Sequence, residues 1–147
     1  MNVIQAAQIT IQEALEAEAT LTAGLASPAV GTEAIYADLA PQGTDMPYVT
    51  HQFIPGGEES RHGTGKGLVM VELTFLVKVV TEGTDQTVCT SLAEIVDQTL
   101  EAVRNHEESG WVFDIYRRSL FYLPLFQDST NYRQAGGRYT VIARPAL

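Results

Sequence analysis

A glycine-rich segment from Pro55 to Gly67 holds the residues whose types and spacing come nearest to a chemical motif. Its stretch Gly63-Thr64-Gly65-Lys66-Gly67 matches part of a phosphate-binding loop, in which glycines, a lysine and a hydroxyl residue cradle phosphate before a helix. Here Ser60 stands at the position of the first glycine, and Gly67 stands where the hydroxyl residue is needed. An alternating apolar stretch, typical of a strand, follows in place of a helix. We therefore exclude nucleotide binding by this segment.

The other residues that could bind metal or perform catalysis are scattered along the sequence. The three histidines are His51, His62 and His106, and no two of them have the four-residue spacing of a helical metal site, so nothing local predicts a metal ion. We expect one of these histidines to be partly packed and the other two to be solvated. Cys89 is the only cysteine, which excludes an intrachain disulfide, and we expect a half-buried structural thiol. Adjacent acids such as Glu58-Glu59 are normally solvated, and no serine has a nucleophile setting. The sequence predicts no enzyme activity and no cofactor.

The charge balance restricts the class of partner. The chain has 147 residues, with 18 acidic and 9 basic side chains and a formal net charge of -9. An acidic surface disfavours binding to nucleic-acid phosphates and to anionic lipid. No apolar run is long enough to span a membrane, and the first residues do not form a signal peptide. We expect a soluble protein of a cytoplasm-like compartment.

Basic residues concentrate in the last third of the chain, where they alternate with tyrosines. Five of the nine are arginines between residues 117 and 144: Arg117, Arg118, Arg133, Arg138 and Arg144. Such a surface could be an interface between subunits, an ordinary solvated sheet face or a stacking site for single-stranded nucleic acid. The acidic balance of the chain opposes the last interpretation. Acidic helices and an arginine-bearing sheet would suit head-to-tail assembly into a ring.

The order of the periodic segments predicts a single α+β domain, residues 1–147. Apolar spacings of three and four indicate helices, and alternation indicates strands. On the second helix we expect Val88 and Leu92 to face the core, with Asp97 and Glu101 pointing away. The helices are expected at 2–23 and 85–105, and the strands at 34–37, 47–54, 68–80, 110–122 (ended by Pro124) and 132–144. This order favours an antiparallel β-sheet with two helices packed on one face.

Several short sequences occur in an order that resembles the tail-completion or tail-terminator proteins of long-tailed phages. After an N-terminal helix of about 20 residues come Ile35-Tyr36-Ala37-Asp38, Pro41-Gln42-Gly43 and Met46-Pro47-Tyr48-Val49. A glycine-rich loop, a long strand, a helix and a strand pair ending in Arg138-Tyr139-Thr140-Val141 follow. The resemblance extends over nearly the whole chain.

The resemblance implies a structural role in a virion. Proteins of this family form a ring, typically hexameric, that ends the tail tube and contacts the head connector. We therefore expect a homo-oligomeric ring in the tail or neck, assembled in the bacterial host cytoplasm, with the tube protein and the connector as partners. DNA would pass through its lumen without specific binding, and acidic side chains there would keep DNA from adhering. A head-side neck adaptor and a small enzyme or ligand-binding domain remain the alternatives.

The segment from Pro55 to Gly67 then becomes a candidate assembly loop that reaches a neighbouring subunit or the tail tube. Its charged residues are the expected contacts: Glu58, Glu59, Arg61, His62 and Lys66. Deleting residues 58–66 is expected to leave the fold intact and to abolish tail joining. An inert hairpin tip is the alternative interpretation.

Overall fold

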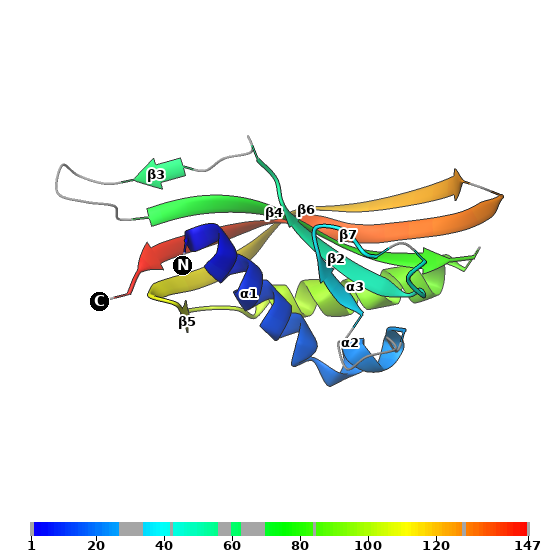
Figure 1. Ribbon diagram of the computed structural model, residues 1–147, viewed down its shortest axis with the longest axis horizontal. Coiled ribbons are helices and arrows are strands. Elements are labelled where there is room, and N and C mark those ends of the chain that lie inside the picture. The colour runs from blue at the N-terminus through cyan, green and yellow to red at the C-terminus, as the bar shows by residue number, and fades with distance from the viewer. Residues whose placement is uncertain are drawn as a thin grey trace.

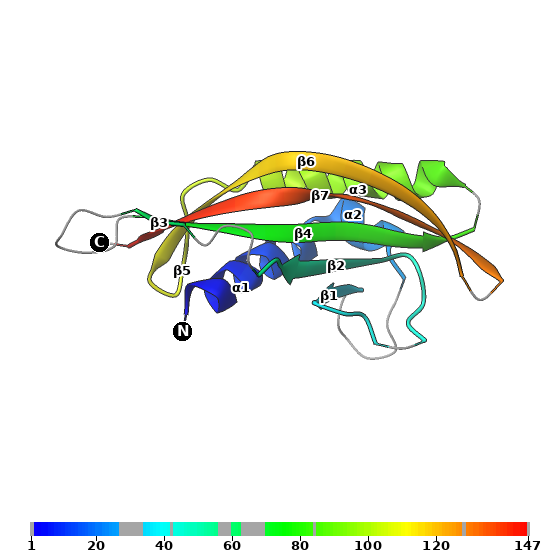
Figure 2. The same cartoon turned by 90° about the horizontal axis from the view of Figure 1, so that it is seen from above.

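The computed structural model describes residues 2–26, 34–41, 43–55, 60–62, 70–83, 85–127 and 129–146. In these residues three helices lie on one face of a seven-stranded sheet, so the predicted α+β class is confirmed (Figures 1 and 2). The sheet is long and curved, and its other face carries no helix (Figure 2). No helix in the described part of the chain is long and apolar enough to cross a membrane.

The predicted first helix, residues 2–23, is two helices. Helix α1 spans Val3–Glu16 and begins with a capping box, in which Asn2 accepts a hydrogen bond from the backbone of Gln5 at 2.9 Å. Helix α2 spans Ala19–Gly24. The break comes at Glu18, whose backbone is extended and whose carboxylate caps α2. Apolar periodicity continues across this break, which is why the sequence predicts one helix.

Helix α3 spans Gln86–Glu101 and ends earlier than predicted. Asp85 caps it by accepting a hydrogen bond from the backbone of Thr87 at 2.8 Å. Its buried face consists of residues three and four apart: Cys89, Leu92, Val96 and Leu100. The prediction for Val88 is therefore wrong, since this side chain is exposed, and Cys89 is fully buried where we expected half-burial.

The sheet has the order β1-β2-β4-β7-β6-β5, and the short β3 also pairs with β4. All pairs are antiparallel except β1 with β2, which are parallel, so the prediction of an antiparallel sheet holds for all but this edge. Strand β3 lies inside the segment predicted as a loop, and β5 was not predicted. The strands are β1 (Ile35–Ala37), β2 (Tyr48–Phe53), β3 (Ser60–His62), β4 (Met70–Glu82), β5 (His106–Glu108), β6 (Trp111–Gln127) and β7 (Thr130–Pro145).

The core lies between the helices and the central strands. Alternate residues of β4 are fully buried there, as the sequence alternation predicts: Val71, Leu73, Phe75, Val77 and Val79. They meet the buried face of α3 and of α1. Gly136 on β7 allows the neighbouring strand to approach, because a Cβ at this position would lie 2.0 Å from the carbonyl oxygen of Val77.

Strand β6 does not end at Pro124, which corrects the prediction. It continues to Gln127 and pairs with β7 along its whole length. Strand β5 pairs only with Trp111–Phe113, so beyond this point β7 is the only strand of the described sheet that pairs with β6. Proline lacks a backbone N–H and is tolerated in an edge strand, where not every N–H pairs within the sheet.

Candidate assembly surface

The distal half of the β6–β7 hairpin forms what we call the arm, residues 119–127 and 130–138. It begins at a register shift between Arg117 and Ser119, which breaks the regular pairing of β6 with β7. The arm lies at one end of the long axis of the molecule, and both chain termini lie at the other end (Figure 1). Residues 119–127 carry no charge, although they form an edge strand.

The arm exposes most of the large apolar side chains found on the described surface. Of eight such side chains, five belong to it: Leu120, Tyr122, Leu123, Leu125 and Phe126. Leu120 is 59% exposed and Phe126 is 67% exposed. Because successive side chains point to opposite faces, the exposed set occupies both faces of the arm. This exposed apolar surface was not predicted, although the sequence contains a signal for it: nine consecutive uncharged residues, 119–127, with apolar side chains at both odd and even positions.

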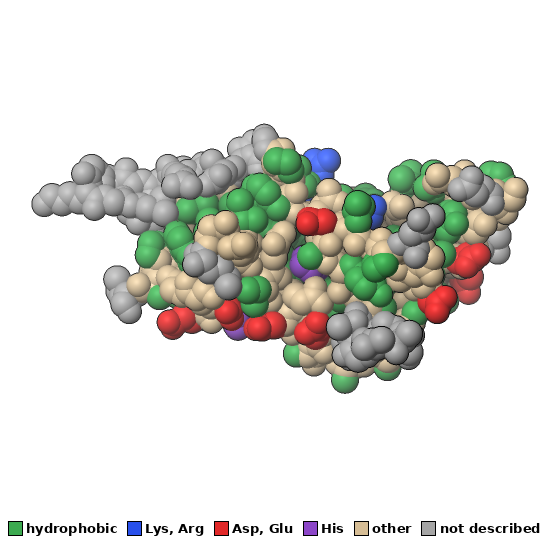
Figure 3. All heavy atoms as spheres, in the orientation of Figure 1, with side chains coloured by type: hydrophobic (Ala, Val, Ile, Leu, Met, Phe, Trp, Pro, Cys, Tyr) green, Lys and Arg blue, Asp and Glu red, His purple; other side chains and the backbone are tan. Residues whose placement is uncertain are grey.

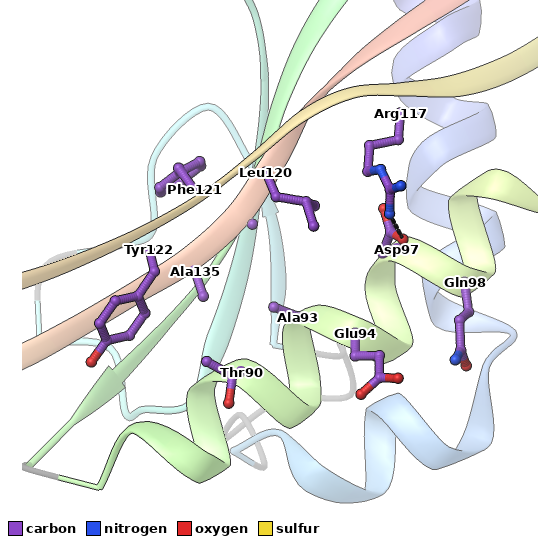
Figure 4. Close-up of a pocket in the computed structure, with 11 residues that line it drawn as sticks. Thr90, Ala93, Glu94, Asp97, Gln98, Arg117, Leu120, Phe121, Tyr122 and Ala135 are labelled. Carbon is purple, nitrogen blue, oxygen red and sulfur yellow. Dashed lines mark hydrogen bonds and ion pairs between the residues drawn. The ribbon is translucent and has the colours of Figure 1, made fainter.

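A groove of about 620 Å³ separates the arm from α3. In Figure 4, Leu120 and Tyr122 point from β6 toward the helix side, whereas Phe121 points away. Figure 4 also shows Thr90 and Ala93 on the facing side of α3. Most of the lining is apolar, with polar groups at one end, where Asp97 and Arg117 meet.

Asp97 anchors α3 to the base of the arm. One carboxylate oxygen lies 3.0 Å from Arg117 Nη1, and the other accepts a hydrogen bond of 2.9 Å from the Tyr139 hydroxyl. Glu101 accepts a hydrogen bond from the backbone N–H of Arg117. Burial, and then the hydrogen bond and charge of Asp97, raise the pKa of Tyr139 well above its ordinary value, so Tyr139 stays protonated. The prediction that Asp97 and Glu101 point away from the fold is therefore wrong.

A second hollow, of about 360 Å³, lies on the other side of the arm. It is bounded by the segment around Pro41 to Met46 and by Tyr48, Leu125 and Tyr132. The arm is therefore flanked by a hollow on each of its two faces.

The five arginines singled out in the sequence do not share one surface. By strand alternation and register, Arg117 and Arg133 lie on the helix-bearing face, and Arg138 and Arg144 lie on the open face. Arg118 stands in the register shift and is exposed. Whether any of them contacts another subunit stays a prediction.

Their local partners differ as well. Arg144 Nη1 lies 2.8 Å from Asp114 and so is held within its own chain. Among the described residues, no ion pair joins Arg118 or Arg138 to an acid. Arg133 has no ion pair among the described residues either, but its side chain is half-buried, whereas Arg118 and Arg138 are exposed. Arg118 and Arg138 are therefore the members of the set whose charge is available to a partner.

The charged residues of the candidate loop lie wholly or in part outside the described structure. Glu58, Glu59 and Lys66 lie outside the described residues. The backbone of Arg61 and His62 belongs to β3, but their side chains lie outside the described set. Their role in assembly stays a prediction.

The other two histidines have different surroundings. His51 is buried rather than partly packed, and its Nε2 lies 2.6 Å from Gln12 Oε1. His106 is exposed, as expected. It lies near Glu13 and Glu108, and their ligand atoms all lie within 4.8 Å of one another. This juxtaposition depends on the packing of α1 against β5, which sequence spacing does not show. The cluster is largely exposed, and we assign it no role.

No protein-family model and no curated protein matches the sequence. Among solved structures, the chain is similar to a chain in the virion of a native gene transfer agent (GTA) particle. The TM-score is 0.71 and the identity 20%, and the alignment covers 97% of this chain and 96% of the other. The two chains therefore share one fold over almost their whole lengths.

Proposed function

We propose that this protein is a structural component of a tailed, phage-like virion. The observation that carries the proposal is the fold shared with a chain of the gene transfer agent virion, which extends to nearly the full length of both chains. The exposed apolar arm also favours a protein that acts by contact with other subunits. In the described residues, the groove beside α3 holds one ion-paired acid and no nucleophile paired with a base.

The finer proposal is a ring, hexameric in the family that the sequence resembles, which ends the tail tube and joins the tail to the head connector. Its partners are further copies of the chain, the tube protein and the connector, and it acts within the tail or neck of the virion. It carries out no catalysis. The net charge of -9 on each copy supports a conduit through which DNA passes without specific binding.

Particles made without this protein test the proposal. We expect electron microscopy to show filled heads beside separate tails of abnormal length, and we expect the purified protein to restore joining when added back. Purified tail tubes should bind it, whereas emptied heads should not. Binding to emptied heads alone would instead assign it to the head side of the neck. Normal particles without the protein, or turnover of a small substrate by the isolated chain, would contradict the proposal.

A further inference from the structure

The arm has two properties of a protein–protein interface whose partner is not part of the described chain. Its exposed apolar side chains occur together on one hairpin, and contiguous patches of this kind usually mark interaction sites. In addition, no other strand of the described sheet pairs with the outer backbone edge of β6 from Ser119 to Gln127, and such edges are normally covered or protected by charge. Residues 119–127 have no charge to protect them.

The helical layer of the same chain has the complementary charge. Helices α1, α2 and α3 contain no lysine or arginine, while they and their N-caps carry seven acids: Glu13, Glu16, Glu18, Asp85, Glu94, Asp97 and Glu101. Of these seven acids, only two form ion pairs in the described residues: Asp97 with Arg117, and Glu101 with Arg104. In Figure 3 most of the acidic side chains lie along the helical side and at the end of β4, and the basic groups in view lie over the strands.

The arm side carries the two exposed arginines that form no ion pair in the described structure, Arg118 and Arg138. Each copy therefore presents an apolar, positively charged surface at the arm and an acidic surface on its helices. A contact between unlike surfaces of identical chains repeats from copy to copy and closes into a ring when the rotation allows. Val88 supplies an exposed apolar side chain on the helical layer, near the start of α3.

From these observations we infer that the arm of one copy docks on the acidic helical layer of a second copy, at α3. Leu123 and Leu125 make the apolar contact from the open face of the arm, and Phe126 makes it from the opposite face near the hairpin tip. Arg118 and Arg138 face the acids of the neighbour. The inference rests on the proposed function, because it supplies the contact between copies that a ring requires. It goes beyond that function by naming the two surfaces.

The first experiment measures the native mass of the purified protein. The double variant Leu123→Asp/Phe126→Asp places two carboxylates on the arm, where they meet the acids of the neighbour. We expect its association to be weaker by at least about tenfold, since two buried apolar contacts are lost. Leu39→Asp is the matched control, because Leu39 is 83% exposed and lies outside the arm, and it should keep the wild-type mass. Circular dichroism checks that all three proteins are folded.

The second experiment identifies the partner. A photoreactive phenylalanine at position 126 is introduced, and chains labelled with ¹⁴N and ¹⁵N are mixed before irradiation. We expect mixed-isotope cross-links between the arm and peptides of α3.

The outcomes separate the two proposals. A wild-type chain that stays monomeric, both alone and on tail tubes, would overturn the proposed ring and this inference with it. A wild-type oligomer that survives Leu123→Asp/Phe126→Asp, or cross-links from position 126 that reach another element or another protein, would overturn the inference and leave the ring intact.

Discussion

Protonation of His51 should destabilise the fold as the pH falls. Its side chain is 1% exposed in β2, where Nε2 lies 2.6 Å from Gln12 Oε1. The Gln12 amide nitrogen donates to the Ile35 carbonyl at 3.0 Å and to Glu16 at 2.7 Å, which fixes the amide orientation. Gln12 Oε1 accepts, so His51 Nε2 carries the hydrogen. The added proton must therefore go to Nδ1, which is buried and has no hydrogen-bond partner in the described structure.

Burial lowers the pKa of His51 to about 4 from an ordinary value of 6.5, although the charges of Asp38 and Glu16 raise it. Between these two pH values the unfolded chain binds more protons than the folded one, so the free energy of unfolding falls with falling pH. One unit of pKa corresponds to about 1.4 kcal/mol, so the full effect is about 3 kcal/mol. About 2 kcal/mol of this is lost between pH 7 and pH 5.

Urea unfolding followed by the fluorescence of the single tryptophan, Trp111, measures this free energy at each pH. The control is His51→Gln, whose amide can still donate to Gln12 but does not titrate. Other titrating groups affect both proteins alike, so the difference between the two curves reports on His51. We expect the wild type to lose about 2 kcal/mol more than the variant between pH 7 and pH 5. Parallel losses would refute the assignment of a buried, neutral imidazole.

Three further changes test the packing around the arm with the same urea assay or a thiol reagent. Gly136→Ala should lower the free energy of unfolding by about 3 kcal/mol or prevent folding, because the new Cβ would lie 2.0 Å from the Val77 carbonyl oxygen. Tyr139→Phe should cost about 1 kcal/mol by removing the hydrogen bond to Asp97. Cys89 should react with a disulfide reagent only after unfolding, because burial removes access to the thiol and raises its pKa.

The class of fold could be predicted from the sequence because two periodic patterns are strong. The alternation along β4 identifies the buried face of the central strand, and every second residue from Val71 to Val79 is buried. Spacings of three and four residues locate the regions of α1 and α3. Both patterns arise because one face of the element is buried against a neighbouring layer, so apolar residues recur in the sequence with the period of the helix or strand.

The boundaries and the polar contacts could not be predicted in the same way. Helix α1 ends where the backbone of Glu18 becomes extended and its side chain caps α2, and the apolar periodicity of the sequence gives no sign of this break. The helical pattern predicts a solvated Asp97, but its carboxylate bonds to Arg117 and Tyr139, which lie 20 and 42 residues further along the sequence. Such contacts depend on which strands are neighbours in the sheet.

The candidate assembly surface was also predictable only in part. A concentration of arginines in the last third of the chain is visible in the sequence, but their separation onto two faces follows from the register of β6 with β7. Leu123 and Phe126 are exposed because no other element of the described chain packs over them. A sequence run shows that these residues are apolar, and only the structure shows that nothing in the described chain covers them.

Pro124 indicates how the arm makes its contact. It lies in the middle of the uncharged run on the free edge, and a proline supplies no N–H to a strand added alongside. Extension of the sheet by a neighbour's strand would therefore leave a carbonyl of that strand without its donor, whereas docking through side chains needs no N–H from β6. Pro124→Val should consequently leave the native mass and the association strength of the oligomer unchanged. Clearly tighter association of this variant, or its growth into fibres, would show that strand pairing along β6 holds the copies together.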